Sequence, residues 1–252
     1  MTVVLDLDGV VWLADRPIAG AADAIATLRG AGQRVLFVSN NSFSPVSDVE
    51  SKLARFDVPA EGDVLTSAVA AATLVRPGER VLVCAGPGAV EALVARGARP
   101  VADGDADAVV VGFHRTFDYD ELRRAATAVR RGARLIGTND DVTYPTPDGP
   151  IPGGGAILAA VAAASGVAPT VAGKPYEPMA ELVRAELAGE LTDAVMVGDR
   201  PDTDGRFARA IGCRFGLVLT GVTHRRDLPV NPAPDLVADD LAGLVDQLLS
   251  RR

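Results

Sequence analysis

Short apolar runs alternate along this chain with longer segments in which apolar residues recur at helical spacing. The runs are rich in β-branched residues and lack polar–apolar alternation, which is typical of parallel strands covered by helices on both faces. We expect strands at Val3–Asp6, Arg34–Ser39, Arg80–Cys84, Ala108–Val111, Arg134–Thr138, Ala194–Gly198 and Arg214–Leu219. We expect helices at Asp120–Arg131, Pro178–Leu187 and Asp239–Leu249. This alternation of strands and helices predicts an α/β protein with a mainly parallel sheet.

The chain is long enough to hold more than one α/β body. A Gly- and Pro-rich stretch at Gly166–Pro175 interrupts the pattern, and the segment from about Ser67 to Ala168 contains strands and helices of its own. A Gly- and Pro-rich interruption of this kind is typical of a domain boundary. We therefore predict a core domain of residues 1–66 and 169–252, with an inserted α/β domain of residues 67–168.

Composition argues against several classes of function. Among 252 residues there are 33 Asp and Glu against 25 Lys and Arg, a net charge of −8, which argues against a protein that binds nucleic-acid backbones. The apolar run Ala156–Ala164 is about half the roughly 20 residues that span a bilayer. No basic segment followed by a long apolar one marks a signal peptide at the start. We expect a cytoplasmic protein that binds neither nucleic acid nor membrane.

The two cysteines and two histidines carry no recognisable motif. Cys84 and Cys213 are too few for a disulfide framework and form no CxxC pair, so we expect small buried hydrophobic residues. His114 and His224 stand outside any metal-binding or triad spacing, so we expect ordinary surface or insert positions.

Acidic residues follow two of the expected strands. Asp6 and Asp8 come at the end of the first, and because side chains alternate along an extended strand, they point to the same side. Such carboxylates repel unless a cation lies between them or one is protonated; a solvated turn after an edge strand is the alternative. Asp199 ends a later strand and Asp204 precedes the next helix. An all-oxygen set of this kind suits Mg²⁺ better than Zn²⁺.

Two further segments suit an anion. Ser39 and Asn40 end the second expected strand and can donate hydrogen bonds to anion oxygens, although these residues also form ordinary turns. Lys174 precedes a helix, where its charge opposes the positive end of the dipole unless an anion is bound. An exposed loop lysine is the alternative.

Taken in order, these motifs resemble those of the haloacid dehalogenase superfamily of phosphotransferases. The resemblance rests on Asp-x-Asp-Gly at 6–9, Ser-Asn at 39–40, Gly-Lys-Pro at 173–175 and Gly-Asp-x-x-x-Thr-Asp at 198–204. The insert is similar to that superfamily's C2-type cap on a Rossmann-like core. Thr138–Asp141 and Pro152–Ala156 resemble the subgroup of NagD-like and 4-nitrophenylphosphatase-like enzymes.

The resemblance implies a role for each acid. Asp6 would be the nucleophile that forms an aspartyl-phosphate, and Asp8 the general acid and base. Mg²⁺ would be held by the Asp6 side chain, the Asp8 main-chain carbonyl and the Asp199 side chain. Asp204 would act through metal-bound water or by orienting its neighbours.

The resemblance also implies how phosphate and substrate are held. Ser39, Asn40 and Lys174 would bind the phosphoryl oxygens. The cap loop would select the substrate through Asn139, Asp141 and Tyr144, although packing is an equal alternative for Tyr144. The Gly-Asp-Arg form, with Arg200, resembles phosphoglycolate, glycerol-phosphate and pyridoxal-phosphate phosphatases more than NagD.

The predicted function is Mg²⁺-dependent hydrolysis of a small phosphorylated metabolite. Sugar phosphates, glycerol phosphate, phosphoglycolate, pyridoxal phosphate and nucleoside monophosphates all fit the resemblance, which also admits a homodimer through the cap. A non-hydrolytic phosphate-binding protein and a receiver-like phospho-Asp signalling protein are the alternatives. Receiver domains are about half this length and lack an inserted cap.

Overall fold

The computed structural model describes residues 1–144, 146, 149–189, 191 and 193–250. The chain forms two compact units, which are described here separately. The first unit comprises Met1–Ser39, Val49–Leu65 and Ala180–Arg252, and the second comprises Asn40–Asp48 and Thr66–Met179. The division into a catalytic core and a cap at residues 67 and 168 stays a prediction.

A parallel sheet forms the centre of the first unit. Its strands are β1 (Thr2–Leu5), β4 (Arg34–Ser39), β5 (Val64–Thr66), β13 (Val195–Gly198), β14 (Arg214–Val218) and β15 (Leu236–Ala238), in the order β15-β14-β13-β1-β4-β5. β1 pairs in parallel with both β4 and β13, and all its residues are buried. The first strand of the chain is therefore central, which places its carboxyl end between two other strand ends.

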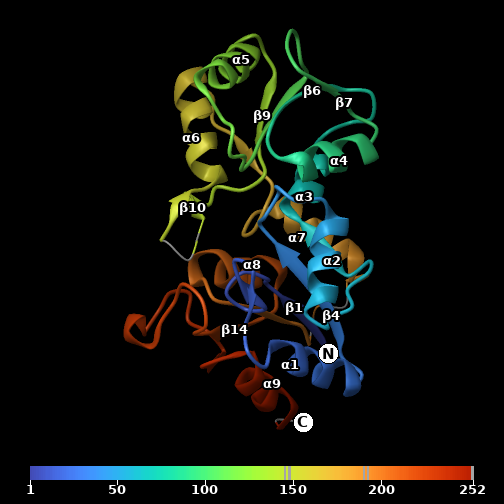
Figure 1. Cartoon of the computed structure of the whole chain (residues 1–252), viewed down its shortest axis with the longest axis vertical. Coiled ribbons are helices and arrows are strands. Elements are labelled where there is room, and N and C mark those ends of the chain that lie inside the picture. The colour runs from blue at the N-terminus through green and yellow to red at the C-terminus, as the bar shows by residue number, and fades with distance from the viewer. Residues whose placement is uncertain (145, 147–148, 190, 192, 251–252) are drawn as a thin grey trace. The chain divides into compact units, whose positions relative to one another are not determined.

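Helices and a short hairpin surround this sheet. The helices are α1 (Ala21–Gly30), α2 (Val46–Arg55), α7 (Glu177–Glu186), α8 (Arg206–Ile211) and α9 (Leu241–Ser250). α1 and α9 pack against each other, as Figure 1 shows near the N- and C-terminal ends. The antiparallel pair β2 (Trp12–Leu13) and β3 (Arg16–Pro17) follows β1 directly.

The second unit is built on its own parallel sheet. Its strands are β6 (Arg80–Cys84), β7 (Arg99–Val101), β8 (Ala108–Val111), β9 (Arg134–Gly137) and β12 (Thr170–Val171), in the order β12-β9-β8-β6-β7. Its helices are α3 (Ser67–Thr73), α4 (Pro87–Ala95), α5 (Tyr119–Arg130) and α6 (Gly154–Ser165), with a hairpin of β10 (Thr143–Tyr144) and β11 (Ile151–Pro152). α5 and α6 lie together on one side of this sheet, and α4 lies on the other (Figure 1).

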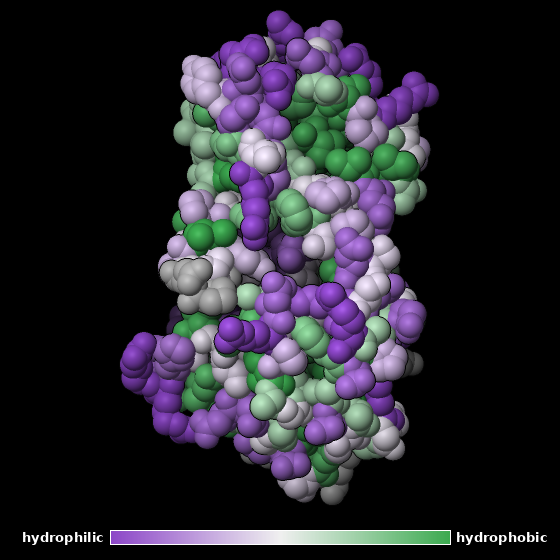
Figure 2. Space-filling model, viewed as in Figure 1, coloured by the Kyte–Doolittle hydropathy of each residue, from purple (hydrophilic) through white to green (hydrophobic). Residues whose placement is uncertain are grey.

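Apolar side chains from both layers form the core of the second unit. Leu82 and Cys84 of β6 and Val109 and Val111 of β8 pack against the small residues of α5. Outside this core, Figure 2 shows apolar side chains gathered over β6 and α4. Val90 and Val94 of α4 are among the exposed large apolar residues of the described chain.

The structure confirms the predicted α/β class and the order of its elements. All seven predicted strands are present with ends within one residue, and the three predicted helices with ends within two. Four short strands, β5, β7, β12 and β15, lie at sheet edges and were not predicted. Across the described residues, no helix combines the length and apolar character needed to cross a membrane.

Candidate active site

The central strands of the first unit deliver two acids to one edge of the sheet. β1 and β13 run in parallel with Leu5 opposite Val197, and Asp6 and Asp199 follow these strands. The Asp6 amide continues the ladder by donating to the Val197 carbonyl at 2.9 Å. Asp6 is only 8% exposed, which excludes the solvated turn that the sequence had left open.

A single irregular turn brings Asp204 back to the same edge. Pro201–Gly205 forms one turn of π-helix between β13 and α8. Within it, the Arg200 amide donates to Asp204 Oδ2 at 3.1 Å. A Cβ atom added at Gly198 would lie 2.1 Å from that oxygen, so glycine is required for the carboxylate to fold over the strand end. Turns of this type are frequent at functional sites.

Asp6, Asp199 and Asp204 form a buried acidic cluster. Each offers a carboxylate oxygen, and these oxygens lie within 4.8 Å of one another. Asp199 Oδ2 accepts a hydrogen bond from the Val222 amide at 2.6 Å. Asp199 Oδ1 is buried and has no hydrogen-bond partner among the described residues. Burial, followed by the charges of Asp204 and Asp6, raises the pKa of Asp199 well above its usual range.

This acidic cluster fits a bound divalent cation. Three negative charges in one buried place are unfavourable, and the orphaned oxygen of Asp199 lacks the partner that a buried carboxylate normally has. A hard cation would supply that partner and compensate the charge.

Two glycines let the neighbouring loops close around Asp199. A Cβ atom at Gly9 would lie 2.4 Å from Asp199 Oδ2, and one at Gly221 would lie 1.9 Å from it. Gly9 also has a φ of 80°, which L-residues rarely adopt. The Thr220 hydroxyl donates to the Gly9 carbonyl at 2.5 Å, which joins the loop after β1 to the loop after β14.

Asp8 lies outside the cluster and has its own partner. Trp12 Nε1 donates to Asp8 Oδ1 at 3.0 Å. The Lys52 ammonium lies 4.2 Å from the centre of the Trp12 ring, within the range of a cation–π interaction. Asp8 is therefore held by a hairpin residue that the sequence did not indicate as part of the site. Ser39 ends β4, the other neighbour of β1, and is buried.

In the second unit, Asn40 and Lys174 are bound to each other. Asn40 Oδ1 accepts from the Lys174 amide at 2.8 Å, and Asn40 Nδ2 donates to the Lys174 carbonyl at 3.0 Å. Lys174 is only 1% exposed, which excludes an exposed loop lysine. A Cβ atom at Gly173 would lie 2.6 Å from Asn40 Oδ1, so the Gly-Lys sequence permits this close approach.

The predicted cap-loop residues join this network. Asn139 is buried and donates from Nδ2 to the Asn40 carbonyl at 2.7 Å, and its Oδ1 accepts from the Asp141 amide at 3.1 Å. Asp141 Oδ2 accepts from Asn40 Nδ2 at 3.0 Å. Tyr144 is half-buried and stacks on Phe113 with 5.5 Å between ring centres, so packing describes its ring contact.

Arg200 is half-buried, and both its main chain and its side chain lie near acids. Its amide holds Asp204, and its Nε lies 3.7 Å from Asp202 Oδ1. The first unit therefore brings together Asp6, Asp199 and Asp204, with Asp8 and Ser39 at ends of neighbouring strands. The second unit brings together Asn40, Lys174, Asn139 and Asp141.

Comparison with known proteins decides the family. The model of haloacid dehalogenase-like hydrolases matches residues 3–99, and a second model of HAD-like hydrolases matches residues 171–244. The chain is 37% identical to D-glycerol 3-phosphate phosphatase of Mycobacterium tuberculosis, over 96% of this chain and 70% of that protein. The chain belongs to the haloacid dehalogenase-like hydrolases. The predicted family is thus confirmed.

Other members of the haloacid dehalogenase-like hydrolases agree over most of their length. Acid sugar phosphatase of Staphylococcus saprophyticus is 36% identical over 92% of this chain and 91% of its own. The solved structure of glycerol phosphate phosphatase from Mycobacterium tuberculosis in complex with magnesium has a TM-score of 0.88 at 36% identity, covering 96% and 75% of the two chains. These relatives are phosphatases, which does not favour the receiver-like alternative.

Sequence reasoning on this haloacid dehalogenase-like hydrolase missed the residues that hold the acids. Trp12 lies four residues after Asp8, and Gly221 and Val222 follow β14. The loop after β14 could have been found by the rule that identified the acids, because β14 is the parallel neighbour of β13. Trp12 follows the first acid motif, but its position in the sequence did not indicate a hydrogen bond to Asp8.

Proposed function

We propose that this protein is a Mg²⁺-dependent phosphatase that hydrolyses small phosphomonoesters. The observation that carries the proposal is the buried acidic cluster of Asp6, Asp199 and Asp204, at the ends of neighbouring parallel strands. Members of the same family with over a third of their residues identical are named as phosphatases, and one is solved with magnesium. Carboxylate oxygens are the ligands that Mg²⁺ prefers.

Asp6 and Asp8 divide the chemistry in this proposal. The Asp6 carboxylate attacks phosphorus, the ester P–O bond breaks, and Asp8 gives its proton to the leaving oxygen. Water then attacks the phosphorus of the phospho-Asp6 intermediate and gives a proton to Asp8. The bond between phosphorus and the Asp6 oxygen breaks, which restores the Asp6 carboxylate and releases inorganic phosphate. The hydrogen bond from Trp12 orients Asp8 for both proton transfers.

The remaining residues hold charge in place. Asp6, Asp199 and the Asp8 carbonyl would hold Mg²⁺, with Asp204 beside them. When bound, Mg²⁺ neutralises charge on the phosphoryl oxygens. Ser39 and Lys174 would hold those oxygens as well. Because both ends of the Asn40 side-chain amide already bind Lys174, we assign Asn40 a positioning role toward that lysine.

Substrate choice falls mainly to the second unit in this proposal. Residues 67–168 would act as a cap, and Asn139, Asp141 and Tyr144 would form specificity contacts, together with Arg200 of the first unit. The names of the relatives include a glycerol phosphate phosphatase, an acid sugar phosphatase and a 5'-nucleotidase, so these three substrate classes come first in the test. A cytoplasmic location, a homodimer through the cap, and the absence of nucleic-acid or membrane partners stay predictions.

Phosphate release from a panel of small phosphomonoesters tests the proposal. The panel contains glycerol 3-phosphate, sugar phosphates, phosphoglycolate, pyridoxal phosphate, nucleoside monophosphates and p-nitrophenyl phosphate, each with Mg²⁺ and with EDTA. We expect release that requires Mg²⁺ and disappears in Asp6→Asn. Release that is insensitive to EDTA, or that persists in a folded Asp6→Asn protein, would contradict the proposal.

A further inference from the structure

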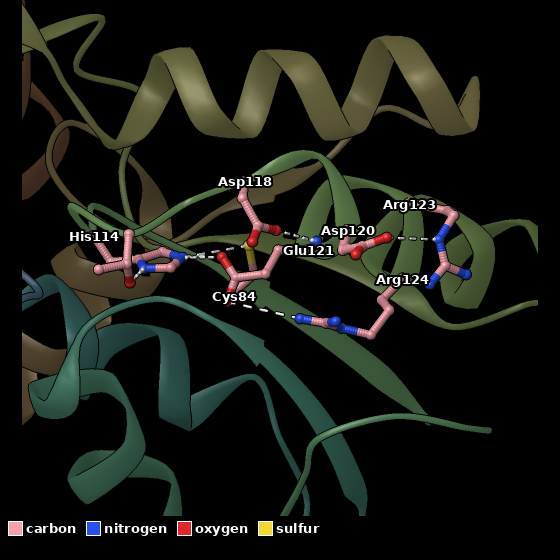
Figure 3. A network of polar contacts seen from close by, with 8 residues as sticks. Cys84, His114, Asp118, Asp120, Glu121, Arg123 and Arg124 are labelled. Carbon is pink, nitrogen blue, oxygen red and sulfur yellow. Dashed lines mark hydrogen bonds and ion pairs between the residues drawn. The ribbon is translucent and has the colours of Figure 1, made fainter.

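A second cluster of ligating side chains lies entirely within the second unit. Cys84, His114 and Glu121 each offer one ligand atom, and these atoms lie within 4.8 Å of one another. Figure 3 shows the three side chains converging from different elements, with Asp118 and Arg124 beside them. None of these residues has a place in the proposed phosphatase chemistry.

The cluster stands where ligands are expected in a parallel sheet. Cys84 ends β6, and Val111, which is opposite Cys84 in the register, ends β8. His114 lies in the loop that follows β8, and Glu121 lies in the first turn of α5. Parallel α/β sheets bind ligands at the carboxyl ends of their strands. A pocket of about 180 Å³ opens here, lined by Cys84, Glu121 and Arg124 among others.

The geometry favours a shared ion over a catalytic relay. His114 Nε2 lies 3.9 Å from Cys84 Sγ and 2.8 Å from Glu121 Oε2, so both groups face the same ring nitrogen. A nucleophile relay instead uses the two different nitrogens of the imidazole ring. Glu121 Oε2 is buried and has no aligned hydrogen bond within the described part of the chain, despite its short distance to His114.

The imidazole ring is oriented for ligation. His114 Nδ1 lies 3.3 Å from Thr116 Oγ1. A proton on Nδ1 that is shared with Thr116 leaves the Nε2 lone pair facing Cys84 and Glu121, which is how metal-binding histidines are held. The ring also packs edge-on against Phe117, and the His114 side chain is only 9% exposed.

We propose that Cys84, His114 and Glu121 form a binding site for a divalent transition-metal ion of the Zn²⁺ class. Thiolate, imidazole and carboxylate are the ligands of such ions, whereas Mg²⁺ takes oxygen alone. Ligand atoms around tetrahedral Zn²⁺ are separated by roughly 3.3–3.7 Å, given bond lengths of about 2.0–2.3 Å. The two distances from His114 Nε2, 3.9 Å to Cys84 Sγ and 2.8 Å to Glu121 Oε2, differ from this separation by about half an ångström. Water from the pocket completes the coordination.

Charge around the cluster also suits a divalent cation. Asp118 and Glu121 each contribute a negative charge, and Arg124 contributes a positive charge, 4.0 Å from Glu121 Oε1. A Cys84 thiolate brings the local sum to −2. Burial, and then the Glu121 charge, raise the pKa of Cys84 to about 12, so the ion displaces a proton on binding.

Cobalt(II) is the probe for this site because a thiolate ligand gives it a charge-transfer absorption band in the near ultraviolet. The titration uses the full chain with saturating Mg²⁺, which would occupy the acidic cluster under the proposed function. We expect one equivalent of Co²⁺ to bind with this band, and Zn²⁺ to displace it. Cys84→Ala should lose the band, and Cys213→Ala, which removes the other buried thiol, should retain it.

A second variant distinguishes loss of a metal ligand from unfolding, in case Cys84→Ala fails to fold. His114→Gln should weaken Co²⁺ binding at least about tenfold while circular dichroism stays unchanged. A parent protein without the band would overturn the proposal, and so would a band that persists in Cys84→Ala. Co²⁺ that Mg²⁺ competes away would belong to the acidic cluster and would also overturn it. The proposed phosphatase activity is unaffected by either outcome.

Discussion

Two clusters of three ligating side chains occupy equivalent places in the two units, at the carboxyl ends of neighbouring parallel strands. The acidic cluster of the first unit offers oxygen atoms alone, from Asp6, Asp199 and Asp204. The cluster of the second unit offers sulfur, nitrogen and oxygen, from Cys84, His114 and Glu121. One kind of sheet edge can therefore present ligands for a hard cation in one unit and for a softer one in the other.

The clusters also differ in how firmly the main chain holds them. In the acidic cluster, amides of Val222 and Arg200 bind carboxylates of Asp199 and Asp204, and glycines allow the surrounding loops to close. In the second cluster, the side chains contact one another, and Thr116 is the support for the imidazole. We therefore expect the acidic cluster to be sensitive to changes in the main chain and the acids around it.

The largest effect is expected from Asp6→Asn. Loss of the nucleophile should reduce phosphate release at least about 1,000-fold. The same change removes one of three negative charges that lie close together, so without Mg²⁺ the variant should resist urea at least as well as the parent. Phosphate release and urea unfolding with EDTA check both expectations. A variant that is inactive only because it is unfolded would leave the comparison without support.

Gly221→Ala tests whether close approach shapes the acidic cluster. The added Cβ would lie 1.9 Å from Asp199 Oδ2, so the carboxylate must move. We expect a loss of activity of about 100-fold, a weaker response to Mg²⁺, and a loss of about 1–3 kcal/mol in the free energy of unfolding. Gly30→Ala is the matched control, because a Cβ atom there meets nothing within 4 Å. Equal activity in both variants would contradict this account of the glycine.

Trp12→Phe separates the Asp8 hydrogen bond from the packing of the hairpin. Phenylalanine keeps an aromatic ring beside Lys52 but removes the N–H group that donates a hydrogen bond to Asp8. We expect kcat to fall about tenfold, which corresponds to about 1.4 kcal/mol, with little change in KM. Leu13→Ala, at an exposed position of the same hairpin, should leave kcat within about twofold. A change in KM alone would remove Trp12 from the positioning of Asp8.

The last prediction concerns stability at high pH alone, and it involves Cys213, a buried thiol outside both clusters. Burial raises its pKa from 9.0 to about 11. The thiol therefore contributes full stability below pH 9 and loses it as the pH rises toward 11. Raising the pH from 7.5 to about 10.5 should lower the free energy of unfolding of the parent by about 2 kcal/mol more than that of Cys213→Ala. Urea unfolding of both proteins at the two pH values measures this difference. Parallel losses in the two proteins would show that the thiol does not titrate in this way.

The two clusters differ in how far sequence predicts them. Asp6 and Asp199 follow long apolar strands directly, so the parallel-sheet rule indicates one shared edge. Cys84, His114 and Glu121 have no motif spacing, and the sequence suggested a buried hydrophobic residue and an unremarkable histidine. The predicted burial of Cys84 is confirmed, but His114 comes close to Cys84 only because β6 pairs with β8.

The missed elements have a similar cause. β5, β7, β12 and β15 contain two or three residues each, too few for an apolar run to stand out. The seven longer strands were predicted because burial on both faces leaves a continuous apolar run. The Trp12 contact with Asp8 depends on a tight hairpin, whose geometry apolar periodicity does not report.

The central claim, that Asp6 accepts the phosphoryl group, is tested most directly by trapping it. The Asp8→Asn protein is mixed with p-nitrophenyl phosphate and Mg²⁺, quenched in acid, digested and analysed by mass spectrometry. The nitrophenolate of this substrate leaves without needing a proton, so the first step proceeds in Asp8→Asn. The second step is blocked because Asp8 can no longer activate water. We predict a phosphoryl group on Asp6. A burst of nitrophenolate with the phosphoryl group on a peptide that lacks Asp6 would contradict the claim.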